Sequence, residues 1–427
     1  MSLRTAIKKI VLMSHQEQTE ETVEITKYLT ITTLDNNFQI TFKGNYTPKY
    51  SYDGETWTDW EQNLTLLISN AGSKLYVKGN LTPGSKCGAF TTTNRFNLSG
   101  NCNSMIFGDD TELNYTLNIS NYNNAFEGLF KNCSVVNISK NFLPSTTISN
   151  YCYRYMFQNC DLLETPPDLP ALYIGTYSYS DMFSGCSNLR YTPSLPAKTI
   201  GSYSYQNMFK GCSLIVSMPD LPCTNLANHC YRYMFQDCLN LVELKELPAT
   251  TLQPYCYYGM FSGCKSIKKT PIIKATTLAN SCCIQMFQYC TSLTEAELPA
   301  TTLAAYCYQQ MFADCTSLTN ITALPATTLT NYCYMGMFIN CTSLVTAPEL
   351  PATTLTNYCY YMMFHGCTSL NYIKALFTTT PQTIYTSDWV NGVSSTGTFI
   401  KSADATWDID IYRGTSAIPE GWIVETI

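Results

Sequence analysis

Charged side chains are scarce in this 427-residue sequence. Asp, Glu, Lys and Arg together supply 13% of the residues, against about 25% in ordinary soluble domains. The net charge is −6 and no run of Lys or Arg occurs, so the chain lacks the basic surface that holds a phosphate backbone. We therefore do not expect nucleic acid as a partner. Hydrophobic residues make up 45% of the chain, which is enough for an extensive core and argues against disorder.

Long apolar runs are also missing. The longest one near the start, Ile10 to Met13, is far too short for the core of a signal peptide or for a membrane span. No lipid-attachment cysteine follows it. We therefore expect no membrane span, and a chain that is made and folded in a cytoplasm.

The residues of the common catalytic sites are sparse as well. The three histidines, His15, His229 and His365, share no spacing, and we interpret the last two as surface substitutions. No nucleophile elbow, phosphate loop or dinucleotide-binding turn is present. Acidic clusters at 53–59 and 404–410 match no calcium-loop pattern and are interpreted as solvated turns, although calcium binding there stays open. The sequence predicts no catalytic, cofactor-binding or metal-binding residues, and hence a protein that is not an enzyme.

What the sequence has instead is a repeat. Ten phenylalanines recur at intervals of 25 to 27 residues: Phe130, Phe157, Phe183, Phe209, Phe235, Phe261, Phe287, Phe312, Phe338 and Phe364. Such a constant period over ten units is typical of a solenoid, in which each unit buries its apolar face against its neighbours.

Cysteines follow the same period. Of the 21 cysteines, 17 stand either three residues after or five residues before a repeat phenylalanine, as Cys341 and Cys333 do around Phe338. Zinc sites use isolated paired clusters rather than a stripe, and a free thiol is a small, readily buried hydrophobe. We therefore expect reduced, buried cysteines. Offsets −5, −1, 0 and +3 share one face of a helix, so the segment typified by 333–341 is predicted to be one or two helical turns.

Tyrosines form two further columns, six residues before seven of the phenylalanines and four residues before eight of them, as Tyr332 and Tyr334 do before Phe338. Rings at both positions are expected to pack between coils with their hydroxyl groups at the rim. Recognition of carbohydrate or protein by these rings is the alternative.

The unit MF-x-x-C-T-S-L, followed by LPATTL and CY, resembles the cysteine-containing leucine-rich repeats of the bacterial surface-antigen (BspA-like) type, over residues 128–376. Such repeats occur in surface proteins of gut bacteria and in structural proteins of their tailed phages. The resemblance implies a curved right-handed solenoid with a parallel sheet on its concave side. The fold class predicted is an α/β repeat, a leucine-rich-repeat solenoid of about ten 26-residue units.

The flanks lack the period. We expect an N-terminal segment at 1–30, whose Leu3, Ile7, Ile10 and Val11 share a helical face and form a candidate anchor. A mostly-β domain is expected at 31–127, with a hairpin around Asp53-Gly54. The solenoid should occupy 128–376, and a capping element 377–427.

A candidate binding surface lies eight residues after each phenylalanine, where the side chains vary while the core columns do not. We call this the +8 column; its candidate binding residues are Tyr191, Glu243, Lys269, Glu295, Asn320 and Tyr372.

The preferred function is a non-enzymatic virion structural or attachment protein of a tailed phage. Its N-terminal region would dock on other virion proteins, and its repeats would bind a host surface glycan or protein. A bacterial cell-surface adhesin and an intracellular interaction scaffold are the alternatives, and a homo-oligomer stays open.

Overall fold

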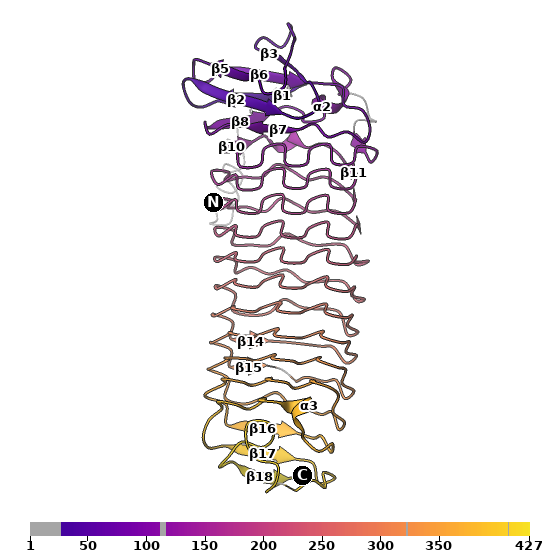
Figure 1. Cartoon of the computed structure of the whole chain (residues 1–427), viewed down its shortest axis with the longest axis vertical. Helices are drawn as coiled ribbons and strands as arrows, with labels where there is room; N and C mark the ends of the chain where they lie inside the picture. The colour runs from indigo at the N-terminus through magenta and orange to yellow at the C-terminus, as the bar shows by residue number, and fades with distance from the viewer. Residues whose placement is uncertain (1–26, 112–116, 322, 409) are drawn as a thin grey trace, which may run out of the picture.

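The computed structural model describes residues 27–111, 117–321, 323–408 and 410–427. It is an elongated stack of coils with a β domain across its N-terminal end (Figure 1). The expected candidate anchor lies almost wholly outside the described residues, as does His15.

Two mainly antiparallel sheets build the N-terminal domain. One sheet has the order β10-β8-β1-β6-β3-β4 and the other the order β5-β2-β7. Alternate residues of β2 (Phe38, Ile40 and Phe42) are buried, the pattern of a strand with one face on a core. The strands are β1 (Leu29–Thr33), β2 (Phe38–Lys43), β3 (Lys49–Ser51), β4 (Thr58–Asp59), β5 (Thr65–Ile68), β6 (Lys74–Lys78), β7 (Ala89–Thr91), β8 (Phe96–Ser99) and β10 (Val135–Ile138).

The hairpin predicted around Asp53 is formed, because β3 pairs with β4 antiparallel and places Tyr50 opposite Thr58. The side chain of Asp53 organises the turn: its Oδ1 accepts hydrogen bonds from the Ser51 hydroxyl (2.7 Å) and from the backbone N–H of Glu55 (2.9 Å) and Thr56 (2.7 Å). These bonds lower the pKa of the Asp53 carboxyl.

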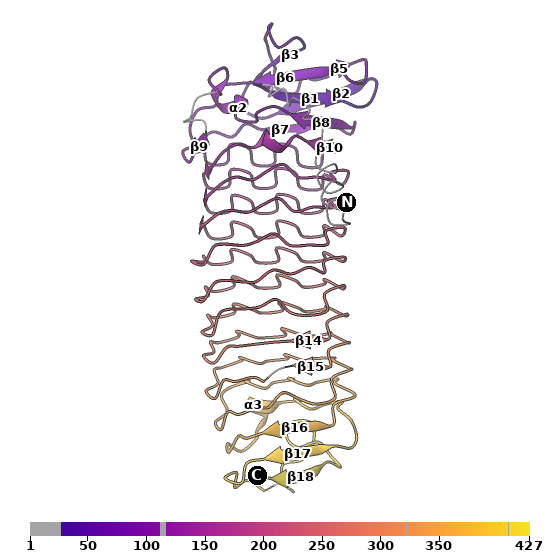
Figure 2. The same ribbon diagram turned by 180° about the vertical axis from the view of Figure 1, so that it is seen from behind.

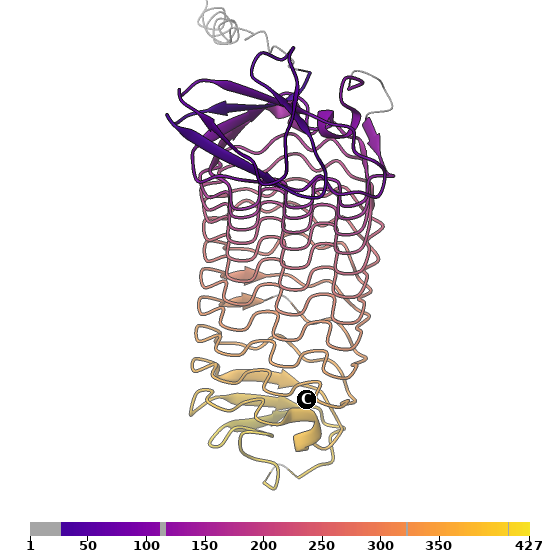
Figure 3. The same cartoon turned by 45° about the horizontal axis from the view of Figure 1, so that its top comes forward.

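The domain merges with the solenoid rather than being linked to it. Strand β10 of the first coil pairs parallel with β8, and the N–H of Phe90 in β7 donates to the carbonyl of Leu129 at 2.8 Å. The ring of Phe90 stacks on that of Phe130 with centroids 5.2 Å apart. The segment around β7 and β8 therefore occupies the place of a preceding coil, and one core runs through both parts. Figure 3 shows the N-terminal sheets lying over the end of the stack.

Each repeat carries a run of tight turns where a helix was predicted. In the coil of Phe157, φ is positive at Tyr151, Tyr155 and Asn159, at +57° to +59°. The N–H of Tyr153 and of Tyr155 donate to carbonyls of the next coil at 3.0 Å, whereas the N–H of Met156 donates to the Tyr153 carbonyl three residues back. Burial follows a period of four residues, close enough to 3.6 to resemble a helical face in sequence. The backbone bonds to its neighbouring coil instead, so the predicted helix is wrong.

The other side of each coil is extended. Parallel pairing joins β9 (Asn118–Ile119), β11 (Thr147–Ile148), β12 (Tyr173–Ile174) and β13 (Thr199–Ile200) into one sheet, and β14 (Glu295–Ala296) with β15 (Asn320–Ile321) into another. Isolated parallel bridges continue this pairing elsewhere, such as Thr251 with Thr277 and Thr277 with Thr302. Helical turns within the described ranges are short: α2 (Ser104–Phe107), η2 (Lys140–Phe142) and α3 (Thr383–Thr386).

The stacking continues beyond residue 376, where the Met-Phe and cysteine pattern ends. Trp389 takes the register position of the repeat methionines, because the N–H of Phe364 donates to its carbonyl at 2.8 Å, as that of Phe338 does to the Met363 carbonyl at 2.9 Å. Strands β16 (Tyr372–Ala375), β17 (Thr398–Lys401) and β18 (Ile423–Thr426) form a parallel sheet. The C-terminal region is therefore built as further coils.

The predicted solenoid of 26-residue repeats is confirmed, with about 12 turns in all and almost no helix. Figures 1 and 2 show little curvature along the stack, in contrast to the curved form that the resemblance implied.

Candidate functional site

The +8 column forms a line along one face of the stack. Parallel pairing places Ser217 beside Glu243, Lys269 beside Glu295, Glu295 beside Asn320, and Tyr372 beside Thr346. Tyr191, Glu243, Lys269, Glu295 and Asn320 are exposed, and Tyr372 is half-buried. Parallel pairing thus places five of the six predicted residues, all but Tyr191, beside the same register position of an adjacent coil.

The middle of this face is hollowed into an open groove of about 950 Å³. Residues 242–246, 268–274, Glu297 and Pro299 line it, so that four lysines and three glutamates surround an apolar strip. Ile272 is 64% exposed on that strip and Val242 is 51% exposed. The sequence analysis identified Glu243 and Lys269 here but missed the apolar pair, although Ile272 stands where the neighbouring units carry Glu246 and Glu297.

Opposite charges bridge adjacent coils within the groove. The Nζ of Lys269 is 3.5 Å from a carboxylate oxygen of Glu295, and the Nζ of Lys274 is 3.5 Å from one of Glu246. All four side chains are largely exposed, and such pairs contribute at most about 1 kcal/mol to stability. The charges are therefore available for a partner of complementary pattern.

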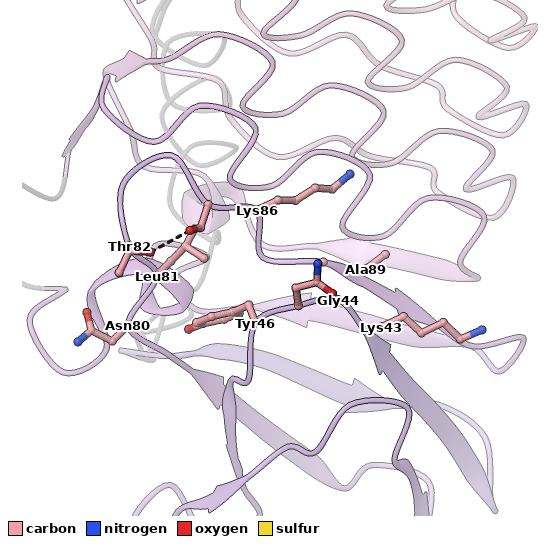
Figure 4. A pocket seen from close by; sticks show the side chains of 11 residues that line it. Lys43, Gly44, Tyr46, Asn80, Leu81, Thr82, Lys86 and Ala89 are labelled. Carbon is pink, nitrogen blue, oxygen red and sulfur yellow. Dashed lines mark hydrogen bonds between the residues drawn. The ribbon is translucent and has the colours of Figure 1, made fainter.

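A second concavity of about 630 Å³ lies in the N-terminal domain, between Lys43, Tyr46, Asn80 and Lys86 (Figure 4). The hydroxyl of Tyr46 crosses to the Met105 carbonyl at 2.8 Å, and burial raises its pKa. Lys86 is paired with Glu127 at 3.2 Å. Tyr46 and Lys86 are thus engaged in structural contacts.

All 21 cysteines are free and buried. Each cysteine that follows a repeat phenylalanine donates an S–H bond to a phenylalanine carbonyl of the preceding coil, at 3.0 to 3.3 Å. Burial raises the pKa of these thiols, to about 12 for Cys186. A buried thiol with a raised pKa is a poor nucleophile. The cysteine column therefore has a structural role, in which its S–H bonds join adjacent coils.

The two tyrosine columns differ in burial. Rings four residues before the phenylalanine are wholly buried, for example Tyr153, Tyr179 and Tyr205. Rings six residues before it stack on one another at the rim, and His229 takes a place in that stack, 4.3 Å from Tyr203 and 4.5 Å from Tyr255. His229 is therefore an inserted ring rather than a simple surface substitution; His365 is half-buried.

The acidic clusters are turns. Asp59 pairs with Lys49 at 2.8 Å, and Asp408 accepts the N–H of Asp410 at 2.9 Å. No group of three or more His, Cys, Asp or Glu that could hold a metal ion occurs among the described residues. In the same part of the chain, every helix is too short or too polar to cross a membrane.

The repeats match a known protein family. A family described as a BspA type leucine-rich repeat region, of six copies, matches three overlapping stretches: residues 154–286, 224–345 and 284–387. Together these stretches cover more than half of the chain. No curated protein matches the sequence.

Proposed function

Because the chain belongs to the BspA-type leucine-rich repeat family, we propose that it is a non-enzymatic attachment protein whose repeat array binds a partner protein through the +8 column. Repeat arrays of this kind offer extended surfaces for partners while their cores hold the coils together.

The observation that carries the proposal is the contrast between columns. The phenylalanine and +3 cysteine columns keep one residue type through ten units, whereas the exposed +8 column presents Glu243, Lys269, Glu295 and Asn320 in succession. Alternating charges beside the exposed Ile272 supply both a charge pattern and an apolar anchor, and specific interfaces combine these two features.

The N-terminal domain is assigned the docking role. It covers one end of the stack and leaves the long faces free, which suits a molecule that projects from a larger assembly. We propose a tailed-phage particle as that assembly, with the chain as a virion structural or attachment protein. A bacterial cell surface, with the chain as an adhesin, is the alternative, and an intracellular scaffold is the second alternative.

A mass-spectrometric inventory of purified phage particles from gut bacteria tests the location. Finding this chain in stoichiometric amounts among the virion proteins is the expected result. Finding it only in a washed bacterial envelope would move the assignment to the adhesin.

Binding of the fluorescently labelled full chain to whole gut bacteria tests the surface. A triple variant, E243A with K269A and E295A, should weaken binding by at least about tenfold, since losing even one hydrogen bond to a charged group costs about 1.5–3 kcal/mol and every 1.4 kcal/mol is about a factor of ten. The matched control is T250A with T276A and T301A, which changes exposed residues of the same coils outside the column. Equal binding by both triple variants and the unchanged chain would exclude the +8 column.

A further inference from the structure

An aromatic column runs along the rim of the solenoid, six residues before eight of the ten repeat phenylalanines. Five rings stack in its first part, with centroids 4.3 to 5.0 Å apart and planes within 10° of parallel: Tyr151, Tyr177, Tyr203, His229 and Tyr255. Three more rings stack in its second part, 4.5 and 4.8 Å apart: Tyr306, Tyr332 and Tyr358. Each internal ring is thus covered on both faces.

Ser281 separates the two parts. Its φ of +57° lies within the +56° to +61° found at the eight ring-bearing positions, so its side chain leaves the backbone in the same direction as theirs. The backbone pairing also continues, because the N–H of Ser281 donates to the Ala305 carbonyl at 2.9 Å and that of Tyr255 to Asn280 at 3.4 Å. The column therefore lacks one ring, although the coil that would carry this ring is present.

The missing ring leaves one face of Tyr255 and one face of Tyr306 without an aromatic partner from this column. Tyr255 is 36% exposed and Tyr306 is 37% exposed, and they are the exposed members of the column, whose other rings are all half-buried. Ser281, 5% exposed, forms the floor between them. The nearby ring of Tyr258 lies 6.3 Å from that of Tyr255, tilted by 60°, and reaches toward the preceding coil, where it is 4.9 Å from Tyr233 and contacts Arg232.

We propose that this slot between Tyr255 and Tyr306 binds one planar aromatic side chain of a partner protein. Two coil steps separate the flanking tyrosines, so an inserted ring would lie one step from each. That step, 4.3 to 5.0 Å elsewhere in the column, is the separation of an offset-stacked pair.

The ligand class follows from what the column already accepts. Both a phenol and the smaller imidazole of His229 stack there, so ring size is not restrictive, whereas planarity is common to every member. A pyranose ring is puckered and thicker than an aromatic ring, so it fits between two parallel ring faces less well than a planar ring does. The slot lies in a different column from the +8 surface, so the inference holds whether or not that surface binds a partner.

Saturation-transfer NMR of N-acetyl-tyrosinamide with the full chain tests the proposal. S281Y supplies the missing ring from the chain itself and should weaken binding of the probe by about tenfold or more. S281A is the matched control and should leave binding unchanged. Y332S opens an equivalent slot between Tyr306 and Tyr358 and should add a second site.

Two results would overturn the inference: binding of N-acetyl-tyrosinamide that S281Y leaves unchanged, or a response to methyl β-glucopyranoside in place of the aromatic probe. The melting temperature of S281Y checks its folding and is expected to rise, because two stacked contacts are gained. If S281Y does not fold, Y306A removes one wall of the slot and should also weaken binding; undiminished binding there would equally refute the slot.

Discussion

Each repeat phenylalanine is held between the phenylalanines of the neighbouring coils. The ring centroid of Phe261 lies 5.9 Å from that of Phe235 and 5.4 Å from that of Phe287, and Phe261 is wholly buried. We expect F261A to lower the free energy of unfolding by about 3–5 kcal/mol, as for other buried aromatics. Chemical denaturation measures the difference.

Replacing Phe130, the first member of the column, with alanine is expected to lower the free energy of unfolding by about the same amount. Phe130 is also wholly buried, since Phe90 and Phe96 of the N-terminal domain cover it as a coil would. A much smaller loss for F130A than for F261A would show that the N-terminal domain covers the first coil only partly.

The cysteines predict a simple chemical result. Because every thiol is buried and free, a maleimide should label almost none of them in the folded chain, and all 21 after denaturation without a reducing agent. Fewer labelled thiols in the denatured chain would reveal disulfides and contradict the S–H bonds to the phenylalanine carbonyls.

His229 should make stability depend on pH. Burial, with a smaller contribution from the charge of Arg232, lowers its pKa below the ordinary value of 6.5. The folded chain then binds fewer protons at this site than the unfolded chain, so stability is lost as the pH falls from about 6.5 toward the lower pKa of the folded state.

The variant H229Y keeps a ring in the stack and removes this group. Its melting temperature should therefore fall less between pH 7.5 and pH 5 than that of the unchanged chain. Titration of the carboxyl groups is common to both proteins and cancels in the comparison. Parallel melting curves would show that His229 does not contribute.

At the scale of the element, the sequence was sufficient to predict the repeat period but not the local backbone conformation. The interval between phenylalanines, the buried cysteines and the Asp53-Gly54 hairpin could all be predicted, since each depends on burial or on turn chemistry. The tight turns could not be predicted, because the buried positions Cys152, Met156 and Phe157 fit a helical period of 3.6 nearly as well as the observed period of 4. Left-handed backbone at Tyr151 and Tyr155 gives no sequence signal, as tyrosine rarely adopts it.

The +8 column could be predicted because residues one repeat apart are neighbours in any solenoid. The groove beside it could not, since it depends on how Lys268, Ile272 and Glu297 of different offsets fold toward one another. The gap at Ser281 is visible in the sequence as a missing tyrosine, but only the stacked geometry of the other rings shows that a space for a ring results.

At the scale of the whole molecule, the beginning of β1 limits what can be removed. Leu29 is wholly buried in this central strand, so a deletion of residues 1–30 would cut into the sheet. We expect deletion of residues 2–26 to leave the solenoid folded but to abolish incorporation into particles or oligomers. Circular dichroism and co-sedimentation with the assembly measure the two effects. Continued co-sedimentation of the truncated chain would place the anchor elsewhere.

The in-register stack also has a genetic consequence. Because each column meets its own kind in the next coil, removing one unit rejoins like to like, and recombination between repeats can shorten or lengthen the array without creating a foreign junction. Loss of residues 256–281, one 26-residue unit, would join Tyr255 to Cys282 and bring the ring of Tyr255 onto that of Tyr306. The molecule would become one coil shorter, and its rim would become an unbroken ladder of eight rings from Tyr151 to Tyr358. A single crossover would thus change the reach of the protein and erase its aromatic slot together.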